Sequence, residues 1–239
     1  PFGGATALAN SFMLSRGPAR EAEFGQPGPR QTFTHEMLHQ WVGGMNAPHG
    51  DITWFIEGLT TYYEYTLPFR AGEIDQTAYI DGLNHLSTIY YTNPGREMSA
   101  DAIVAVGFND GDIRHAPYQR GALYFADLDV RIREASNGTR SLDDLMKTVF
   151  AAREDGSLDL TIETWAAEAA KETGADELAI VQRVHLDGEL FLPSADGFGL
   201  CVEGAPATFT AEDGREVDGI SWVKSADMSG EDCFAVSAE

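Results

Sequence analysis

Two histidines four residues apart, His35 and His39, enclose a glutamate in the pattern His-Glu-x-x-His. Positions four apart lie on one face of an α-helix, so both imidazoles can bind the same metal ion. Glu36 is rotated by roughly 100° from His35 about the helix axis and can reach a water molecule on that ion. Glu57, from the next predicted helix, supplies a third ligand atom. Three protein ligands leave a fourth position open for water, which is typical of a catalytic site with one Zn²⁺.

The chemistry expected of this group is hydrolysis. A bound Zn²⁺ lowers the pKa of its water to about 7 and polarises a carbonyl, and Glu36 can take the proton of that water and pass it to a leaving amine. The metzincin arrangement needs Gly and His three and six residues after the second histidine. Val42 and Met45 hold those positions and exclude it.

Two predicted helices position these residues. Apolar residues recur three and four apart over about residues 30–42, and a pair of glycines then ends the pattern. After a loop, Asp51 or Thr53 can cap a second helix. That helix is expected to cover residues 54–66 and to end before Pro68.

The remaining pattern predicts an α+β fold that is mainly helical. A strand region is expected at residues 1–15, where paired glycines precede small and apolar residues, followed by a helical lobe at 30–190. Its further helices are expected at about 74–91, from Pro117 to Asn137-Gly138, from a capping box at Ser141 to about 153, and near 162–172 and 175–186, with residues 95–115 irregular. A hairpin with a turn at Asp213-Gly214 follows. We therefore predict a domain at 1–195 and a small β-rich segment at 196–239.

The composition limits the class of protein. The formal net charge is −22 and 43% of the residues are apolar. This balance predicts a folded chain and disfavours nucleic-acid binding, which needs a basic face. No apolar run reaches the ~18 residues of a membrane span. Cys201 and Cys233 either form a disulfide, which would favour a periplasmic or secreted location, or remain thiols in a cytoplasmic protein. Nothing in the sequence indicates an oligomeric state.

Three sequence blocks, HEMLHQWVG, WFIEGLTTYYEY and PYQRGAL, resemble those of the gluzincin zinc metallopeptidases. The aminopeptidase N and glycyl aminopeptidase families carry such blocks, and the resemblance extends over roughly residues 1–190. It implies a thermolysin-like catalytic domain, one Zn²⁺ held by His35, His39 and Glu57, a peptide substrate and aminopeptidase-like activity. It also implies that Tyr118, in the third block, hydrogen-bonds the oxyanion of the tetrahedral intermediate.

The same resemblance suggests tasks for further residues. Glu64 matches a family carboxylate that would hold a ligand histidine in the required tautomer; the alternative is a surface acid of the helix. Thr61, one turn after Glu57, is a weaker candidate for the same task. Arg120 replaces a family lysine and would contact a substrate carbonyl or carboxylate, or else lie on the helix surface. Ile56 stands where an asparagine usually precedes the ligand glutamate.

The chain departs from the family pattern at the expected amino-group site. These families place a Gly-Gly-x-Glu strand before the histidine motif, and its glutamate binds the α-amino group of the substrate. Here Thr6 stands where that acid is expected, after Gly3 and Gly4. The glycine backbone can still pair with the substrate as an edge strand. A gluzincin endopeptidase and a zinc-binding scaffold without turnover are the alternative functions.

The other histidines have plainer interpretations. His49 lies between the two ligand helices, but Glu57 fits the ligand role better. His115 precedes Tyr118 by three residues and either lines the cleft or is a loop histidine without a role. His185 is expected on a helix, at the surface or packed.

Overall fold

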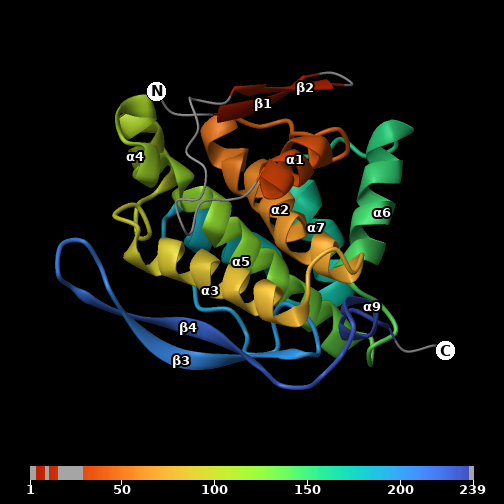
Figure 1. Ribbon diagram of the computed structural model, residues 1–239. Coiled ribbons are helices and arrows are strands. Elements are labelled where there is room, and N and C mark those ends of the chain that lie inside the picture. Colours follow the sequence, from red (N-terminus) through yellow and green to blue (C-terminus); the bar gives the residue numbers. More distant parts are fainter. Residues whose placement is uncertain (1–3, 9–10, 16–28, 237–239) are drawn as a thin grey trace.

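Two long helices, α2 (His49–Arg70) and α5 (Gly111–Ala135), pack against each other through the middle of the molecule (Figure 1). The computed structural model describes residues 4–8, 11–15 and 29–236. The other elements, in chain order, are β1 (Gly4–Leu8), β2 (Ser11–Ser15), α1 (Pro29–Leu38), α3 (Gln76–Thr92), α4 (Ala100–Val106), the 3₁₀ turn η1 (Gly107–Asn109), α6 (Leu142–Glu154), α7 (Ile162–Thr173), α8 (Glu177–Val181), the π-helical turn η2 (Gln182–Leu186), β3 (Val202–Thr210), β4 (Glu216–Lys224) and α9 (Gly230–Cys233).

The crossing of α2 and α5 is close because both helices carry glycine at the contact. A methyl group on Gly121 would lie 2.2 Å from the carbonyl oxygen of Trp54, and one on Gly58 would lie 2.5 Å from the Cα atom of Gly121. Backbone therefore meets backbone at this point. Glu57 directly precedes the first glycine and Tyr118 lies three residues before the second, so the crossing brings two predicted site residues together.

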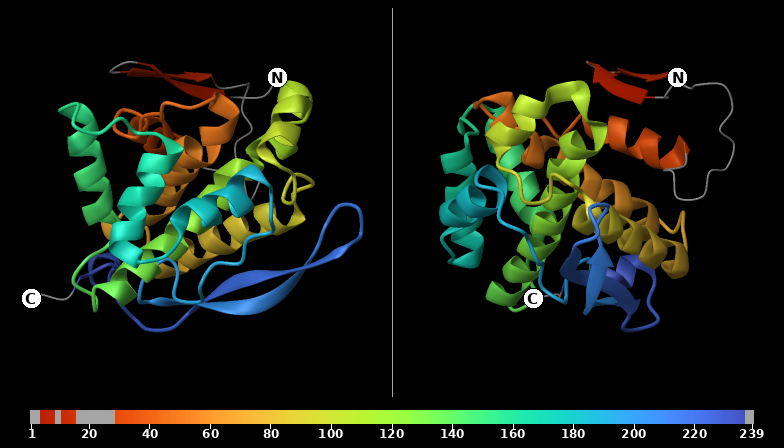
Figure 2. Two further views of the ribbon diagram at one scale, coloured as in Figure 1. Left: turned by 180° about the vertical axis from the view of Figure 1, so that it is seen from behind. Right: turned by 90° about the vertical axis from the view of Figure 1, so that its left-hand side faces the viewer.

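Two antiparallel hairpins lie at opposite ends of the molecule (Figures 1 and 2). In the first, Gly4 of β1 pairs with Ser15 of β2. The hairpin contacts α1 and the turn after it, where Gln40 Nε2 donates to the Leu8 carbonyl oxygen at 3.0 Å. In the second, β3 pairs with β4 on either side of the predicted turn. This hairpin packs on α3.

The C-terminal hairpin shares its core with the helices. Trp222 of β4 is buried, and its indole N–H donates to Ser87 Oγ on α3 at 2.9 Å. Cys201 and Cys233 form a disulfide with Cα atoms 5.1 Å apart. The prediction of a mainly helical chain with a small β segment near each end is confirmed, and the domain boundary at residue 195 stays a prediction. Within the described residues, no helix is both long and apolar enough to cross a membrane.

The two ligand helices differ from the predicted ranges. The α-helical hydrogen-bond pattern of α1 ends at Leu38, so His39 begins the turn that follows. Helix α2 starts at His49, before both predicted caps, and its N-cap Pro48 makes no side-chain cap bond. It also continues through Pro68, because a proline in the last turn removes only one hydrogen bond while the apolar face stays packed.

The segment predicted to be irregular contains helices. Helix α4 begins after Ser99, whose hydroxyl accepts from the Ala102 N–H. Helix α5 begins at Gly111, where the Asp110 carboxylate accepts two backbone N–H groups. Pro117 therefore lies inside α5 rather than at its start. The sequence predicts a helix start at the proline, whereas the Asp110 side chain caps a helix that already begins at Gly111.

A buried histidine that packs on α2 makes the stability of the protein depend on pH. His185 lies in η2, stacks on Trp54 with ring centroids 4.1 Å apart, and is 3% exposed. Neither ring nitrogen has a hydrogen-bond partner. Burial, and to a lesser extent the charge of Arg120, lowers the pKa of His185 well below 6.5. The folded protein therefore holds this ring neutral.

We expect the free energy of unfolding of His185→Phe to decrease less than that of wild type as the pH is lowered. Below a pH of about 6.5 the unfolded chain binds a proton at His185, whereas the folded chain does not. The free energy of unfolding therefore falls by up to about 1.4 kcal/mol for each unit by which the pH is lowered. Phenylalanine keeps the stacking on Trp54 and removes that proton uptake. Urea unfolding of both proteins from pH 8 to pH 5 measures the effect. His85→Phe, at a half-buried position, should change the slope less. Parallel stability curves for wild type and His185→Phe would contradict the explanation.

Candidate metal centre and active site

Three donor atoms converge between α1 and α2. His35 Nε2 lies 3.2 Å from His39 Nε2 and 3.2 Å from Glu57 Oε2, and His39 Nε2 lies 3.3 Å from Glu57 Oε2. A tetrahedral zinc with bonds of about 2.0–2.1 Å places its ligand atoms about 3.3–3.4 Å apart. The three donor atoms of His35, His39 and Glu57 therefore form a triangle with the dimensions of one face of a zinc tetrahedron. Among the described residues, this is the one cluster of three or more His, Cys, Asp or Glu side chains that could hold a metal ion.

The far nitrogen of each imidazole is held by a partner. His35 Nδ1 donates to Glu64 Oε2 at 2.7 Å. Thr60 Oγ1 lies 3.4 Å from His39 Nδ1, and its own proton goes to the Ile56 carbonyl oxygen at 2.7 Å, which leaves a lone pair toward the histidine. With both Nδ1 atoms protonated, both Nε2 atoms present lone pairs to the centre of the triangle. In this tautomer the three acceptors could all bind one cation at that point.

The electrostatics favour positive charge at the same point. Burial by itself would lower the pKa of His35, but hydrogen bonds and charge from Glu57 and Glu64 raise it to about 10. Burial would raise the pKa of Glu57, but the two histidines hold it at about 2. The carboxylates thus stabilise either a proton on the imidazole or a metal ion. An N,N,O donor set of this kind suits Zn²⁺.

Thr60 was missed by the sequence interpretation, which named Thr61. Both threonines follow Glu57 by about one turn of α2, and both are buried. Spacing alone does not separate them, because which of them faces α1 depends on how the two helices are rotated against each other. The structure places the hydroxyl of Thr60 beside a predicted ligand histidine.

We expect Thr60→Val to weaken zinc binding about three- to tenfold, and Thr61→Val to leave it unchanged. The valine removes the acceptor beside His39 Nδ1 at nearly constant volume, and partners of this kind are typically worth 10–100-fold when the bond is short. Competition with a fluorescent zinc chelator measures both affinities. Equal effects of the two substitutions would show that the hydroxyl contact is not what matters.

Two further predicted residues border the triangle. The ring of Tyr118 stacks on that of His35 with centroids 6.1 Å apart and planes 9° from parallel. Burial, and next the charge of Glu57, raises the pKa of Tyr118, so its hydroxyl stays a hydrogen-bond donor. Glu36 is 7% exposed, and burial raises its pKa although both histidines oppose the shift. A carboxylate with a raised pKa accepts protons more readily.

Residues 29–106 match the sequence profile of the M61 glycyl aminopeptidase family. The matched stretch contains α1, α2 and the three donor atoms of the triangle, and it ends before Tyr118. No curated protein sequence matches the chain.

Among solved structures, the fold is similar to that of an aminopeptidase N family protein from Idiomarina loihiensis. The TM-score is 0.63 and the sequence identity is 20%, over 90% of this chain and 41% of that chain. The chain thus spans less than half the length of that protein. At this identity the likeness establishes a shared fold.

Of the three residues predicted to contact the substrate, only Arg120 has side-chain contacts that assign it another task. Arg120 is 1% exposed and donates to the carbonyl oxygens of Gly95, Arg96 and Met98. It is therefore not a surface charge, and its guanidinium ties α5 to the loop before α4. Gly4 lies in β1, and Gly3 is outside the described residues.

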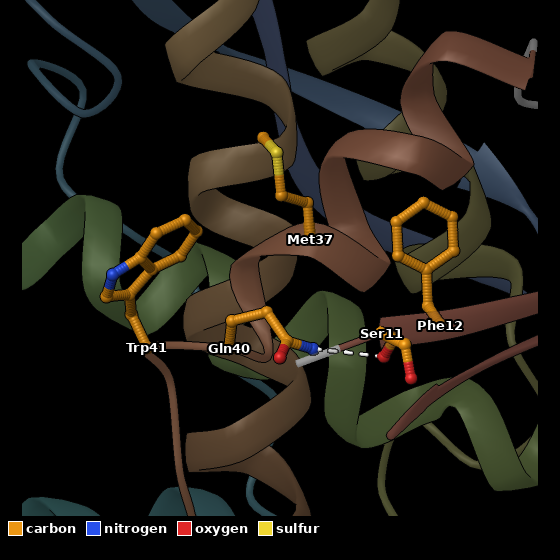
Figure 3. Close-up of a pocket in the computed structure, with 5 residues that line it drawn as sticks. All are labelled: Ser11, Phe12, Met37, Gln40 and Trp41. Atoms are coloured by element: carbon orange, nitrogen blue, oxygen red, sulfur yellow. Dashed lines mark hydrogen bonds between the residues drawn. The ribbon is translucent and has the colours of Figure 1, made fainter. Parts of the chain in front are cut away.

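A separate hollow of about 440 Å³ lies between β2 and the C-terminal part of α1 with the turn that follows it (Figure 3). Met37 lines it from α1, Trp41 from the turn after α1, and Phe12 from β2. Met37 is two residues from each histidine of the motif, which turns it away from the ligand face. The hollow belongs to the contact between α1 and the first hairpin, and not to the triangle.

Proposed function

We propose that this chain is the catalytic region of a gluzincin zinc metallopeptidase with aminopeptidase-like activity. The observation that carries the proposal is the triangle of two imidazole nitrogens and one carboxylate oxygen, with Glu36 beside it. The match of residues 29–106 to the M61 glycyl aminopeptidase family and the aminopeptidase-like fold support the same class. The substrate class is a peptide.

Each residue of the site has a defined task in this reaction. His35, His39 and Glu57 would hold the zinc, which when bound polarises the scissile carbonyl and acidifies a water molecule. Glu36 accepts a proton from the attacking water and donates it to the leaving amine. Tyr118 donates a hydrogen bond to the carbonyl oxygen as negative charge develops on it. Glu64 and Thr60 keep the two imidazole rings in the tautomer that binds metal.

Two finer features of the proposal concern substrate and compartment. Thr6 stands where an acid would bind the substrate's amino group, and this favours an endopeptidase as the second candidate. The Cys201–Cys233 disulfide supports a periplasmic or secreted location, because such bonds persist in oxidising compartments.

The test combines metal content with hydrolysis. The protein is freed of metal with a chelator, reloaded with Zn²⁺, and assayed on a peptide library whose members carry either free or acetylated N-termini. We expect one zinc per chain and release of N-terminal residues from the free peptides only. Equal cleavage of acetylated peptides would identify an endopeptidase. Zinc binding without turnover would identify a scaffold, and no zinc binding would refute the assignment.

A further inference from the structure

The ring of Tyr118 lies between two imidazoles. On one side it stacks on the ring of His35. On another side it meets His115 edge-to-face, with centroids 5.0 Å apart and planes at 90°. Aromatic pairs in this geometry attract each other by about 0.5–1.5 kcal/mol beyond the area they bury. Besides its side-chain hydrogen bonds with Arg114 and Glu57, the tyrosine thus contacts one predicted zinc ligand and one histidine that has no task in the reaction described above.

The backbone of α5 creates the second contact. His115 and Tyr118 are three residues apart on one helix, and residues at this spacing are neighbours on its surface. Ala116 and Pro117 between them are both buried. The predicted loop placement of His115 is wrong, since His115 lies on α5 and contacts Tyr118.

Arg114 fixes the orientation of the His115 ring. Arg114 Nη2 donates to His115 Nε2 at 3.0 Å, which places the ring proton on Nδ1. Burial, and next the charge of Arg114, lowers the pKa of His115, so that its ring is neutral near neutral pH. A neutral imidazole that is held by a hydrogen bond packs against the phenol ring in a fixed orientation.

We propose that His115 is a positioning residue that holds the Tyr118 hydroxyl where it meets the developing oxyanion. The inference rests on the proposed function and deepens it. An oxyanion donor acts only when it lies within hydrogen-bond distance of the oxygen in the transition state. Displacing it affects the chemical step and leaves substrate binding nearly unchanged, because the charge is absent in the bound substrate.

The kinetic test compares His115→Ala, which removes the ring, with His115→Phe, which keeps an aromatic edge and loses the bond to Arg114. We expect His115→Ala to lower kcat about tenfold with KM within about twofold of wild type, and His115→Phe to retain kcat within about threefold. In a Tyr118→Phe background the alanine substitution should have no further effect, since the hydroxyl it positions is gone. A full tenfold loss in that background, or no loss in wild type, would overturn the proposal.

A second measurement does not depend on turnover. Proteins labelled with ¹³C-tyrosine report the ring-flip rate of Tyr118, whose signal is assigned by its loss in Tyr118→Phe. We expect faster flipping in His115→Ala than in wild type or His115→Phe, with the other tyrosine signals and the zinc content unchanged. An unaltered Tyr118 signal in His115→Ala would refute the positioning contact. Absent hydrolysis by zinc-loaded wild type would instead refute the proposed function, so the two failures are distinguishable.

Discussion

Glu36→Gln is expected to lower kcat for peptide hydrolysis by about 10²- to 10⁴-fold while one zinc per chain remains bound. That loss corresponds to about 2.7–5.5 kcal/mol in the activation free energy. The amide has almost the same shape as the carboxylate and cannot accept the proton of the attacking water. Glu36 is turned away from the ligand face of α1, and the three donor atoms of the triangle come from other residues, so metal binding should survive.

Two comparisons sharpen this prediction. Glu36→Asp keeps a carboxylate but withdraws it by one methylene, and should therefore lose less activity than the amide. His39→Ala removes a ligand atom and should lose zinc and activity together. Metal content by atomic absorption, measured on the same samples as kcat, separates the two causes. Turnover by Glu36→Gln within a few-fold of wild type would exclude Glu36 as the general base.

Gly121→Ala is expected to destabilise the fold by about 2–4 kcal/mol. The new methyl group would lie 2.2 Å from the Trp54 carbonyl oxygen and 2.7 Å from the Gly58 Cα atom, and both are backbone atoms that cannot rotate away. Helices α2 and α5 must separate to admit it. Tyr118 then shifts relative to Glu57, and a displacement of about 1 Å can cost 10²-fold in rate.

Gly111→Ala is the matched control on the same helix. A methyl group there meets nothing within 4 Å, so its effect on the free energy of unfolding should stay within about 0.5 kcal/mol. Urea unfolding gives both free energies, and kcat measured at a temperature where both variants are folded tests the shift of Tyr118. Equal stabilities of the two variants would show that the glycine contact does not set the helix separation.

The local parts of the site were predictable from residue spacing. His35, Glu36 and His39 depend on one helix turn, whose geometry is the same in any protein, and the structure brings the two histidines to Glu57 as the spacing indicated. Helix ends were less predictable. Pro68 and Pro117 both lie within helices because tertiary packing outweighs the loss of a single backbone bond, and Asp110 rather than a proline starts α5.

By itself the sequence predicted the donor atoms, the proposed general base and the mainly helical class, because each of these predictions depends on patterns within single helices. Only the tertiary structure decided which side chains support them. Thr60 rather than Thr61 reaches His39, Arg120 is buried on carbonyl groups, and His115 meets Tyr118 next to His35. The physical reason is that these contacts depend on the rotation and separation of packed helices. The backbone contact between Gly58 and Gly121 sets that separation, and no spacing within one helix reveals it.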